Sequence, residues 1–176
     1  MKWPGVKDVE VAQMKEKRSL AGLKKQLINA PPTRDFIGAL KEANARTGFP
    51  GFIAEGSFEN LEAIRNFGVQ CPLLCKEFVI DAWQLFYARL KGDNAILLIA
   101  AVLPDLDIKY MIKICKLLGL TALVKVHDER EMDRVLEIEG IELVGINNRD
   151  LGIISKIVQI SIVINVVSIF VLPICC

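Results

Sequence analysis

From residue 52 onward, short apolar runs alternate with longer segments in which apolar residues recur at helical spacing. The apolar runs cover 52–54, 73–75, 95–102, 122–126 and 143–146, and each is bounded by glycine, proline or a charged residue. Runs that are apolar throughout are typical of parallel strands covered on both faces. The pattern therefore predicts five buried parallel strands.

The segments that separate and follow these runs predict helices, because each has a recognisable start and a glycine at its end. They span 57–67, 81–91, 104–118 and 128–139, and Asp128 with Glu131 has the spacing of a capping box. Strand starts at 73, 95, 122 and 143 are 22, 27 and 21 residues apart. A repeating strand-helix unit predicts an α/β fold, either a doubly wound open sheet or a barrel.

Two amphipathic helices are predicted before this repeat. The first spans 8–28, with Leu20, Leu23 and Leu27 on one stripe, and the prolines at 31 and 32 stop it. The second is predicted to be capped by Thr33 and to end near Gly48, and three apolar residues share one of its faces: Phe36, Leu40 and Ala43. Both helices are expected to cover an apolar surface.

Composition and charge exclude several functional classes. The 176 residues are 52% hydrophobic and carry 22 basic and 21 acidic side chains, so no field of one sign attracts nucleic acid or an anionic membrane. The single histidine, His127, excludes a multi-histidine metal site. Five cysteines without a C-x-x-C pair indicate buried thiols in a reducing compartment. The first 17 residues are not expected to be a signal or transit peptide, because they lack an apolar h-region and are too acidic.

Residues 153–176 have a different composition, with 17 apolar residues among 24 and one charge, Lys156. We therefore divide the chain into a domain at 1–152 and an apolar tail at 153–176. Three interpretations of the tail stay open. It could form a membrane segment at 157–176, or one or two strands that complete the sheet. The third, which we favour, is a segment never selected for structure, such as a translated non-coding continuation.

Polar residues close four of the predicted strands, namely Glu55, Lys76, Lys125 and Asn147. Catalytic groups converge at the carboxyl ends of barrel strands, which favours a site at that edge. Polar residues that merely mark strand ends are an equally weighted alternative. No G-x-G-x-x-G or Walker loop follows any strand, which weakens a nucleotide-binding interpretation.

Seven segments, in the same order, resemble indole-3-glycerol phosphate synthases, most closely the plant form. They are APPTRDFIGAL at 30–40, FIAE at 52–55, GSFENLEAI at 56–64, CPLLCKEF at 71–78, LLIAAVL at 97–103, VHDEREMDRVL at 126–136 and GINNRDL at 145–151. The resemblance covers roughly 8–152. It implies a (β/α)8 TIM barrel with extra N-terminal helices, and chloroplast localisation or otherwise a cytoplasmic one.

The implied enzyme is a carboxy-lyase of tryptophan biosynthesis that uses no metal or organic cofactor. It closes the indole ring of a phosphorylated small molecule, 1-(2-carboxyphenylamino)-1-deoxyribulose 5-phosphate, with loss of CO₂ and water. By resemblance, Lys76 is the general acid that protonates the sugar carbonyl and Glu55 is the acidic residue of strand 1. The implied substrate-binding residues are Asn147 for a substrate oxygen, Arg149 for the carboxylate and Phe78 for the aromatic ring.

Competing interpretations of these residues are structural. Lys76 could form an ion pair with Glu77, and Asn147 and Arg149 could serve a turn and the surface.

The sequence departs from the family at Lys125, where the family has a glutamate that serves as the base. Loss of a general base costs ~10²- to 10⁴-fold in rate. A second ammonium near Lys76 would also disfavour the charged form of both lysines. We therefore expect the chain to be impaired or inactive as an enzyme.

Two further departures concern whole elements. Glu55 is followed directly by Gly56, where the family has a lysine-bearing loop, a helix and a strand, and Gly56 alone is not expected to bridge that gap. After Gly152 the family's strands 7 and 8 have no counterpart. We expect an incomplete, internally deleted and C-terminally truncated barrel that retains strands equivalent to 1, 3, 4, 5 and 6. Its open edges predict self-association. The alternative function is a non-enzymatic fragment that associates with a full-length subunit or, less expected, a membrane.

Overall fold

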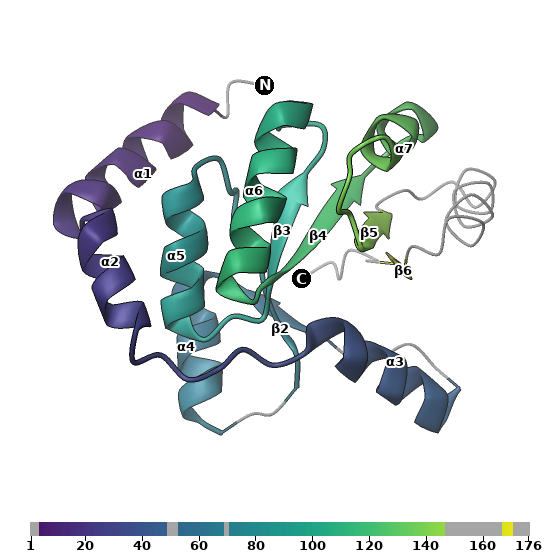
Figure 1. Cartoon of the computed structure of the whole chain (residues 1–176), viewed down its shortest axis with the longest axis horizontal. Coiled ribbons are helices and arrows are strands. Elements are labelled where there is room, and N and C mark those ends of the chain that lie inside the picture. The colour runs from purple at the N-terminus through teal and green to yellow at the C-terminus, as the bar shows by residue number, and fades with distance from the viewer. Residues whose placement is uncertain (1–3, 49–52, 69–70, 147–166, 171–176) are drawn as a thin grey trace.

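Strands and helices alternate through most of the chain, of which the computed structural model describes residues 4–48, 53–68, 71–146 and 167–170 (Figure 1). Three helices come first: α1 Pro4–Lys17, α2 Leu20–Leu27 and α3 Phe36–Thr47. The alternating part comprises β1 Ala54–Gly56, α4 Phe58–Asn66, β2 Leu73–Cys75, α5 Ala82–Lys91, β3 Ala95–Ile99, α6 Asp105–Leu118, β4 Thr121–Val126, α7 Glu129–Leu136, β5 Leu143–Ile146 and β6 Val167–Phe170. The predicted α/β repeat is confirmed.

The six strands form one sheet in which every neighbouring pair is parallel and the order follows the sequence, from β1 to β6. This is the arrangement of a (β/α)8 barrel that is incomplete, with extra helices at its N-terminal side. Among the described residues β1 and β6 are the two edges, so the barrel is not closed. Self-association through these edges stays a prediction.

The connection between β1 and β2 differs from our expectation at Gly56. The structure bridges the missing segment by pairing β1 directly with β2, with Ala54 opposite Leu73 and α4 as the crossover. Parallel strands need a crossover connection, and α4 supplies it. This helix begins after Ser57, whose side chain caps the first turn by accepting from the Asn60 N–H. The sheet therefore continues as though one whole strand-helix unit had been removed.

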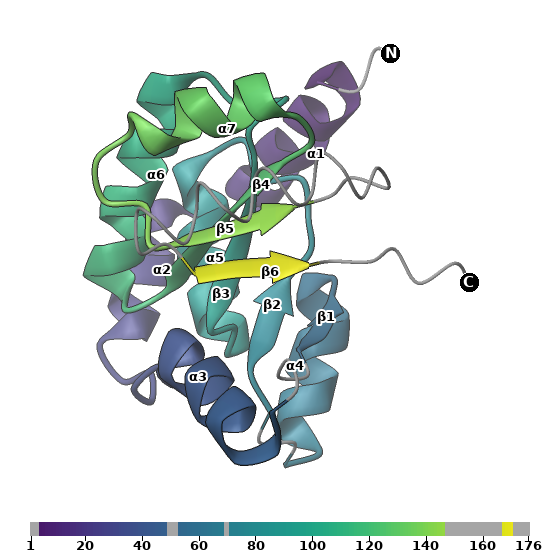
Figure 2. The same cartoon turned by 90° about the vertical axis from the view of Figure 1, so that its right-hand side faces the viewer.

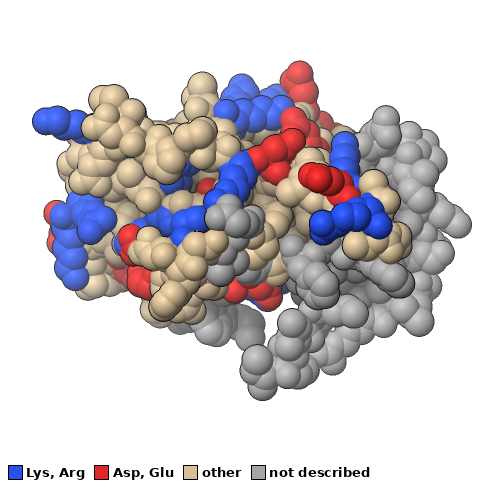
Figure 3. Space-filling view, turned by 90° about the horizontal axis from the view of Figure 1, so that it is seen from below, with Lys and Arg blue, Asp and Glu red and all other residues tan. Residues whose placement is uncertain are grey.

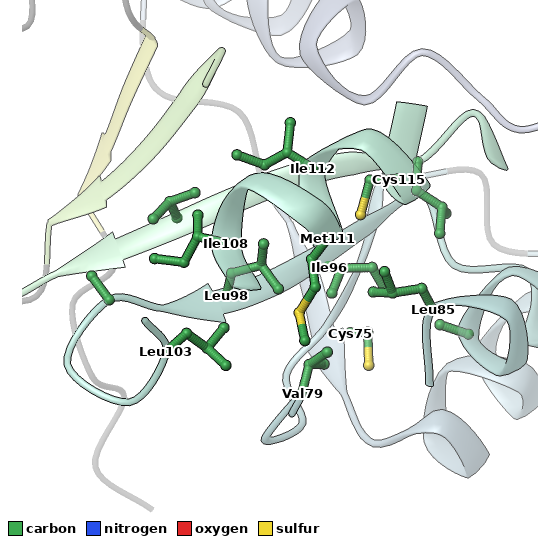
Figure 4. Close-up of a cluster of buried hydrophobic side chains, with 14 of the residues drawn as sticks. Cys75, Val79, Leu85, Ile96, Leu98, Leu103, Ile108, Met111, Ile112 and Cys115 are labelled. Carbon is green, nitrogen blue, oxygen red and sulfur yellow. The ribbon is translucent and has the colours of Figure 1, made fainter. Parts of the chain in front are cut away.

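A large apolar core lies between the sheet and the helices α4, α5, α6 and α7 (Figure 4). Strand residues such as Ile96, Leu98 and Val124 face it, and α6 contributes Ile108 and Met111. The opposite face of the sheet carries a second cluster, formed by Phe36, Leu40, Leu74, Ala95, Leu97, Ile99, Leu123 and Leu143. We call this second face the inner face; α3 packs against it, away from α5 and α6 (Figure 2).

The N-terminal helices begin and end at residues that differ from our predictions. The expected single helix at 8–28 breaks into α1 and α2, because Ser19 adopts an extended conformation and its side chain accepts from the Gly22 N–H at 3.2 Å. Asp35, not Thr33, caps α3, since its carboxylate accepts from the Gly38 N–H at 2.8 Å. At the other end of the chain α7 stops at Leu136, three residues short of the prediction.

Positive and negative side chains are interspersed on the face shown in Figure 3. Among the described residues, no helix combines the length and the apolar character that crossing a bilayer requires.

Most of the apolar tail, residues 153–176, lies outside the described residues. The part that is described, β6, pairs in parallel with β5, with Leu143 opposite Val167. This pairing favours the interpretation of the tail as a strand that extends the sheet. The division of the chain at residue 152 stays a prediction.

A buried acidic residue stands where α5 leads into β3. Asp93 is only 1% exposed, and neither of its oxygens has a partner with hydrogen-bond geometry in the described part of the chain. Burial raises its pKa to about 8, although the adjacent Cys75 thiol and the cations of Arg65 and Lys91 oppose the shift. The folded state therefore holds a proton on Asp93 that the unfolded chain releases above about pH 4.

We expect stability to fall as pH rises from about 4 to about 8, because the folded state binds the extra proton over that window. Asp93→Asn should remove this slope and be more stable than the parent at pH 8, by at least about 2 kcal/mol. Urea unfolding at pH 5 and pH 8 measures the effect. Asp133→Asn, on the exposed side of α7, is the matched control and should leave the slope unchanged. Equal stability of Asp93→Asn and the parent at pH 8 would contradict this account.

Candidate functional site

Three of the predicted site residues lie at the carboxyl end of the sheet, on its inner face. Side chains alternate between the two faces of a strand, so Lys76 follows Leu74 and Lys125 follows Leu123 onto the face where those leucines are buried. Glu55 is opposite Leu74 in the register of β1 and β2. We call Glu55, Lys76 and Lys125 the rim residues, because they stand above the inner apolar cluster.

Glu55 and Lys76 form a direct ion pair between neighbouring strands. The backbones of these strands are joined where the Lys76 N–H donates to the Gly56 carbonyl oxygen at 2.9 Å. The alternative pairing of Lys76 with Glu77 is wrong, since Glu77 instead accepts from the Lys7 ammonium of α1 at 3.0 Å. The pair leaves the Lys76 side chain 40% exposed, so its ammonium group is within reach of a ligand.

Lys125 is partly buried on β4, between Ile99 of β3 and Gly145 of β5 in the register of the sheet. Burial lowers the pKa of its ammonium group, and the charge of Lys76 lowers it further, whereas the carboxylates of Glu131 and Glu55 act in the opposite direction. The charge of Lys76 therefore acts on Lys125 in the expected direction, although burial is the larger cause.

Glu131, predicted from the sequence only as part of a helix cap, lies close to the site. Its carboxylate accepts from the His127 backbone N–H at 2.9 Å and lies 3.3 Å from His127 Nδ1. Its own N–H donates to the Asp128 carboxylate, which begins α7. These contacts place Glu131 directly after β4, within electrostatic range of Lys125. The four-residue spacing from the only histidine was the signal that could have pointed to it.

The structure describes only one of the three predicted substrate-binding residues. Asn147 and Arg149 lie outside the described residues. Phe78 follows β2 and is 42% exposed, and its carbonyl oxygen accepts from the buried Gln84 side chain at 2.9 Å. The structure thus brings together the acidic and basic rim residues, with one exposed aromatic ring on the same βα loop as Lys76.

Elsewhere in the described chain we find one hollow and two buried thiols. A hollow lies between α1 and the start of α5 and is lined by Asp8, Val11, Ala12, Lys15, Ile80 and Asp81. Within the described ranges, no three side chains of the metal-binding types come together. Cys75 and Cys115 are buried free thiols, as expected, and burial raises the pKa of both, to about 12 for Cys115.

Comparisons with known proteins point to one family. The sequence model described as indole-3-glycerol phosphate synthase matches residues 52–162. The indole-3-glycerol phosphate synthase, chloroplastic, of Arabidopsis thaliana is 55% identical over 187 residues. That of Crocosphaera subtropica (strain ATCC 51142 / BH68) is 41% identical over 187 residues. Both alignments cover 82% of this chain, but only 46% and 62% of the respective relatives.

The lengths of the same alignments show that this chain lacks residues within the matched region. They run over 187 residues, whereas the 82% of this chain that they cover amounts to about 144 residues. About 43 residues of each relative therefore have no counterpart within the matched part of this chain. A gap of this length has room for one strand-helix unit, which spans 21 to 27 residues in this chain, together with a long loop. It is compatible with the direct pairing of β1 with β2.

A solved structure supports the fold. The X-ray crystal structure of the YdjI aldolase from Escherichia coli K12 matches with a TM-score of 0.50 and 12% identity, covering 80% of this chain and 63% of that chain. At this identity the likeness shows the fold alone.

The charge of Lys125 is expected to cost stability at neutral pH. Its pKa is lower in the folded than in the unfolded state, so stability should rise as pH increases from the folded value towards 10.5. Lys125→Met should remove this dependence and stabilise the protein at pH 7, by less than about 1 kcal/mol because solvent screens the partly exposed group. Urea unfolding of this variant beside Lys113→Met, an exposed control on α6, is the measurement. A destabilised Lys125→Met variant would contradict the repulsion at the rim.

Proposed function

Because the chain belongs to the indole-3-glycerol phosphate synthase family, we propose that it derives from the carboxy-lyase of tryptophan biosynthesis and has an impaired form of its site. The substrate is the family's phosphorylated small molecule, 1-(2-carboxyphenylamino)-1-deoxyribulose 5-phosphate. In the proposed reaction the aromatic ring attacks the sugar carbonyl, and CO₂ and water leave as the indole ring forms.

The observation that carries this proposal is the position of Lys76 at the carboxyl end of β2, ion-paired with Glu55. The Lys76 side chain is partly exposed. It lies at the carboxyl end of the sheet, where the sites of barrel enzymes are built. A lysine so held can donate a proton to the sugar carbonyl oxygen as the ring carbon attacks it. Lys76 is therefore proposed as the general acid, and Glu55 as the group that positions it.

The impairment is proposed from Lys125. The family's base is a carboxylate at this position, and an ammonium group cannot accept the proton that the closing ring must lose. Lys125 also adds positive charge beside Lys76 instead of the negative charge that would hold a cationic intermediate. The gap after Glu55 supports the same conclusion, because the family's substrate-binding loop has no counterpart there.

The remaining roles follow from the family and are proposed on that basis. Phe78 would form the apolar wall against the aromatic ring, Asn147 would bind a substrate oxygen and Arg149 would bind the carboxylate. The chloroplastic relative supports plastid localisation, which we include in the proposal.

We expect the purified chain to produce indole-3-glycerol phosphate no faster than ~10⁻² of the rate of a complete family enzyme, since loss of the base alone costs ~10²- to 10⁴-fold. Lys125→Glu should raise the rate of the parent at least ~10-fold, because it restores a carboxylate at the end of β4. Product fluorescence measures both rates. Lys125→Gln is the matched control, since it removes the positive charge without supplying a base.

Two results would contradict the proposal. One is turnover by the parent chain at the rate of a complete enzyme. The other is an equal gain in Lys125→Glu and Lys125→Gln, which would mean that charge removal, not the restored base, explains the change.

A further inference from the structure

Helix α6 carries apolar side chains on two opposite sides. One side is buried in the core against the sheet through Ile108, Met111, Ile112 and Cys115. On the other side three large side chains are exposed, with Leu106 and Leu117 at 81% and Tyr110 at 55%. Their spacings of four and seven residues place them in one stripe along the helix, which we call the outer stripe. A helix on the surface of a soluble protein normally has a polar outer side, so the outer stripe needs a cause of its own.

The open edges of the sheet do not explain this exposure. Helix α6 connects β3 to β4, the two middle strands of the described sheet, whereas the edges are β1 and β6 (Figure 1). Strands added at those edges would leave the outer side of α6 uncovered. The other helices of the repeat differ from α6, because α4, α5 and α7 have no exposed large apolar side chain within their bounds. The outer stripe is thus a property of α6 itself.

The charges of α6 are divided along its length. Its first turn carries Asp105 and Asp107, and its last turn carries Lys116. At 3.6 residues per turn, Asp105 and Lys116 lie on the same side of the outer stripe. Two copies of α6 that pack antiparallel therefore bring each acidic first turn against the basic last turn of the other copy, where the charges and the helix dipoles attract.

Both charged ends are open to a second partner. Asp105 pairs with Arg134 and Lys116 pairs with Glu142 within the chain, at 3.2 Å in each case. The side chains of Asp105 and Lys116 nevertheless stay about half exposed. A carboxylate accepts and an ammonium group donates several hydrogen bonds, so each can add a contact with another molecule without giving up the first.

We propose that the outer stripe is a dimer interface, and that its occupant is a second copy of this chain with the two α6 helices antiparallel about a two-fold axis. In this arrangement Leu106 packs against Leu117 of the partner subunit, and Tyr110 lies opposite Lys113 of the partner subunit, where an ammonium group can contact the aromatic ring. The two-fold axis makes each contact occur twice.

The second copy is the occupant because both features of the surface are complementary to themselves: the stripe reads the same from either end, and the acidic end matches the basic end. A contact built on one pair of helices is small for a protein interface, so the dimer is reversible and its population rises with concentration. The inference is independent of the proposed function, since α6 and the rim residues lie on opposite faces of the sheet.

Analytical ultracentrifugation of the full chain at rising concentrations measures the dimer. We expect the double variant Leu106→Gln/Leu117→Gln to raise the dissociation constant at least ~10-fold, because four apolar contacts are lost across the two-fold axis. Phe67→Gln is the matched control, since Phe67 follows α4 and is 88% exposed, and it should leave the dissociation constant unchanged. Circular dichroism checks that each variant is folded.

Cross-linking with a carbodiimide, which joins a carboxylate to an amine in direct contact, tests the antiparallel arrangement. Asp105 and Lys116 of one helix are about 16 Å apart along its axis, so a cross-link between these residues forms only between two copies. The Lys15 and Asp81 pair, at 2.8 Å within the chain, is the internal control and should cross-link at every concentration. We expect the Asp105–Lys116 cross-link to increase with concentration and to be lost in the double variant.

Three results would overturn the proposal. The first is a parent chain that stays monomeric at every concentration. The second is an association that the double variant leaves intact or that Phe67→Gln weakens equally, which would place the contact elsewhere, such as at the sheet edges. The third is a dimer without the Asp105–Lys116 cross-link.

Discussion

The direct parallel pairing of β1 with β2 is the constraint on which the site depends. Parallel strands lie about 4.8 Å apart, so the pairing places Glu55 beside Lys76 and lets the two side chains form an ion pair. The family resemblance implies that the segment absent after Glu55 is one strand and one helix, which makes this pairing possible. Removing a whole unit preserves the strand direction and leaves α4 as the crossover. Removing part of a unit would leave β1 without a parallel partner.

The chemistry at the rim follows from alternation along the strands. Leu74 and Leu123 are buried on the inner face, and the residues two positions later, Lys76 and Lys125, are above them at the carboxyl end. We propose that Lys76 keeps the role of the family's general acid, whereas Lys125 stands at the position of the family's base. Because Lys125 puts a cation on the rim where the family has a carboxylate, it supports the proposed impairment of ring closure.

The strand-helix repeat was predictable from sequence because buried parallel strands are apolar throughout, and β2 and β5 have the predicted bounds. The helix boundaries were less predictable, since Ser19 and Asp35 compete with other capping residues that only the folded backbone excludes. The rim lysines were identified at strand ends, but the Glu55 partner of Lys76 was not, because pairing across the gap depends on tertiary structure. Glu131 was missed for a different reason, because only its capping spacing with Asp128 was considered and not its local contact with His127.

The site exists only if β1 pairs with β2 in the observed register. NMR scalar coupling across the hydrogen bond between the Lys76 amide nitrogen and the Gly56 carbonyl carbon, whose donor and acceptor are 2.9 Å apart, measures this pairing. We predict a correlation between these two nuclei and slow exchange of the Lys76 amide proton. A Lys76 amide that exchanges freely, or couples to a carbonyl outside β1, would contradict the account.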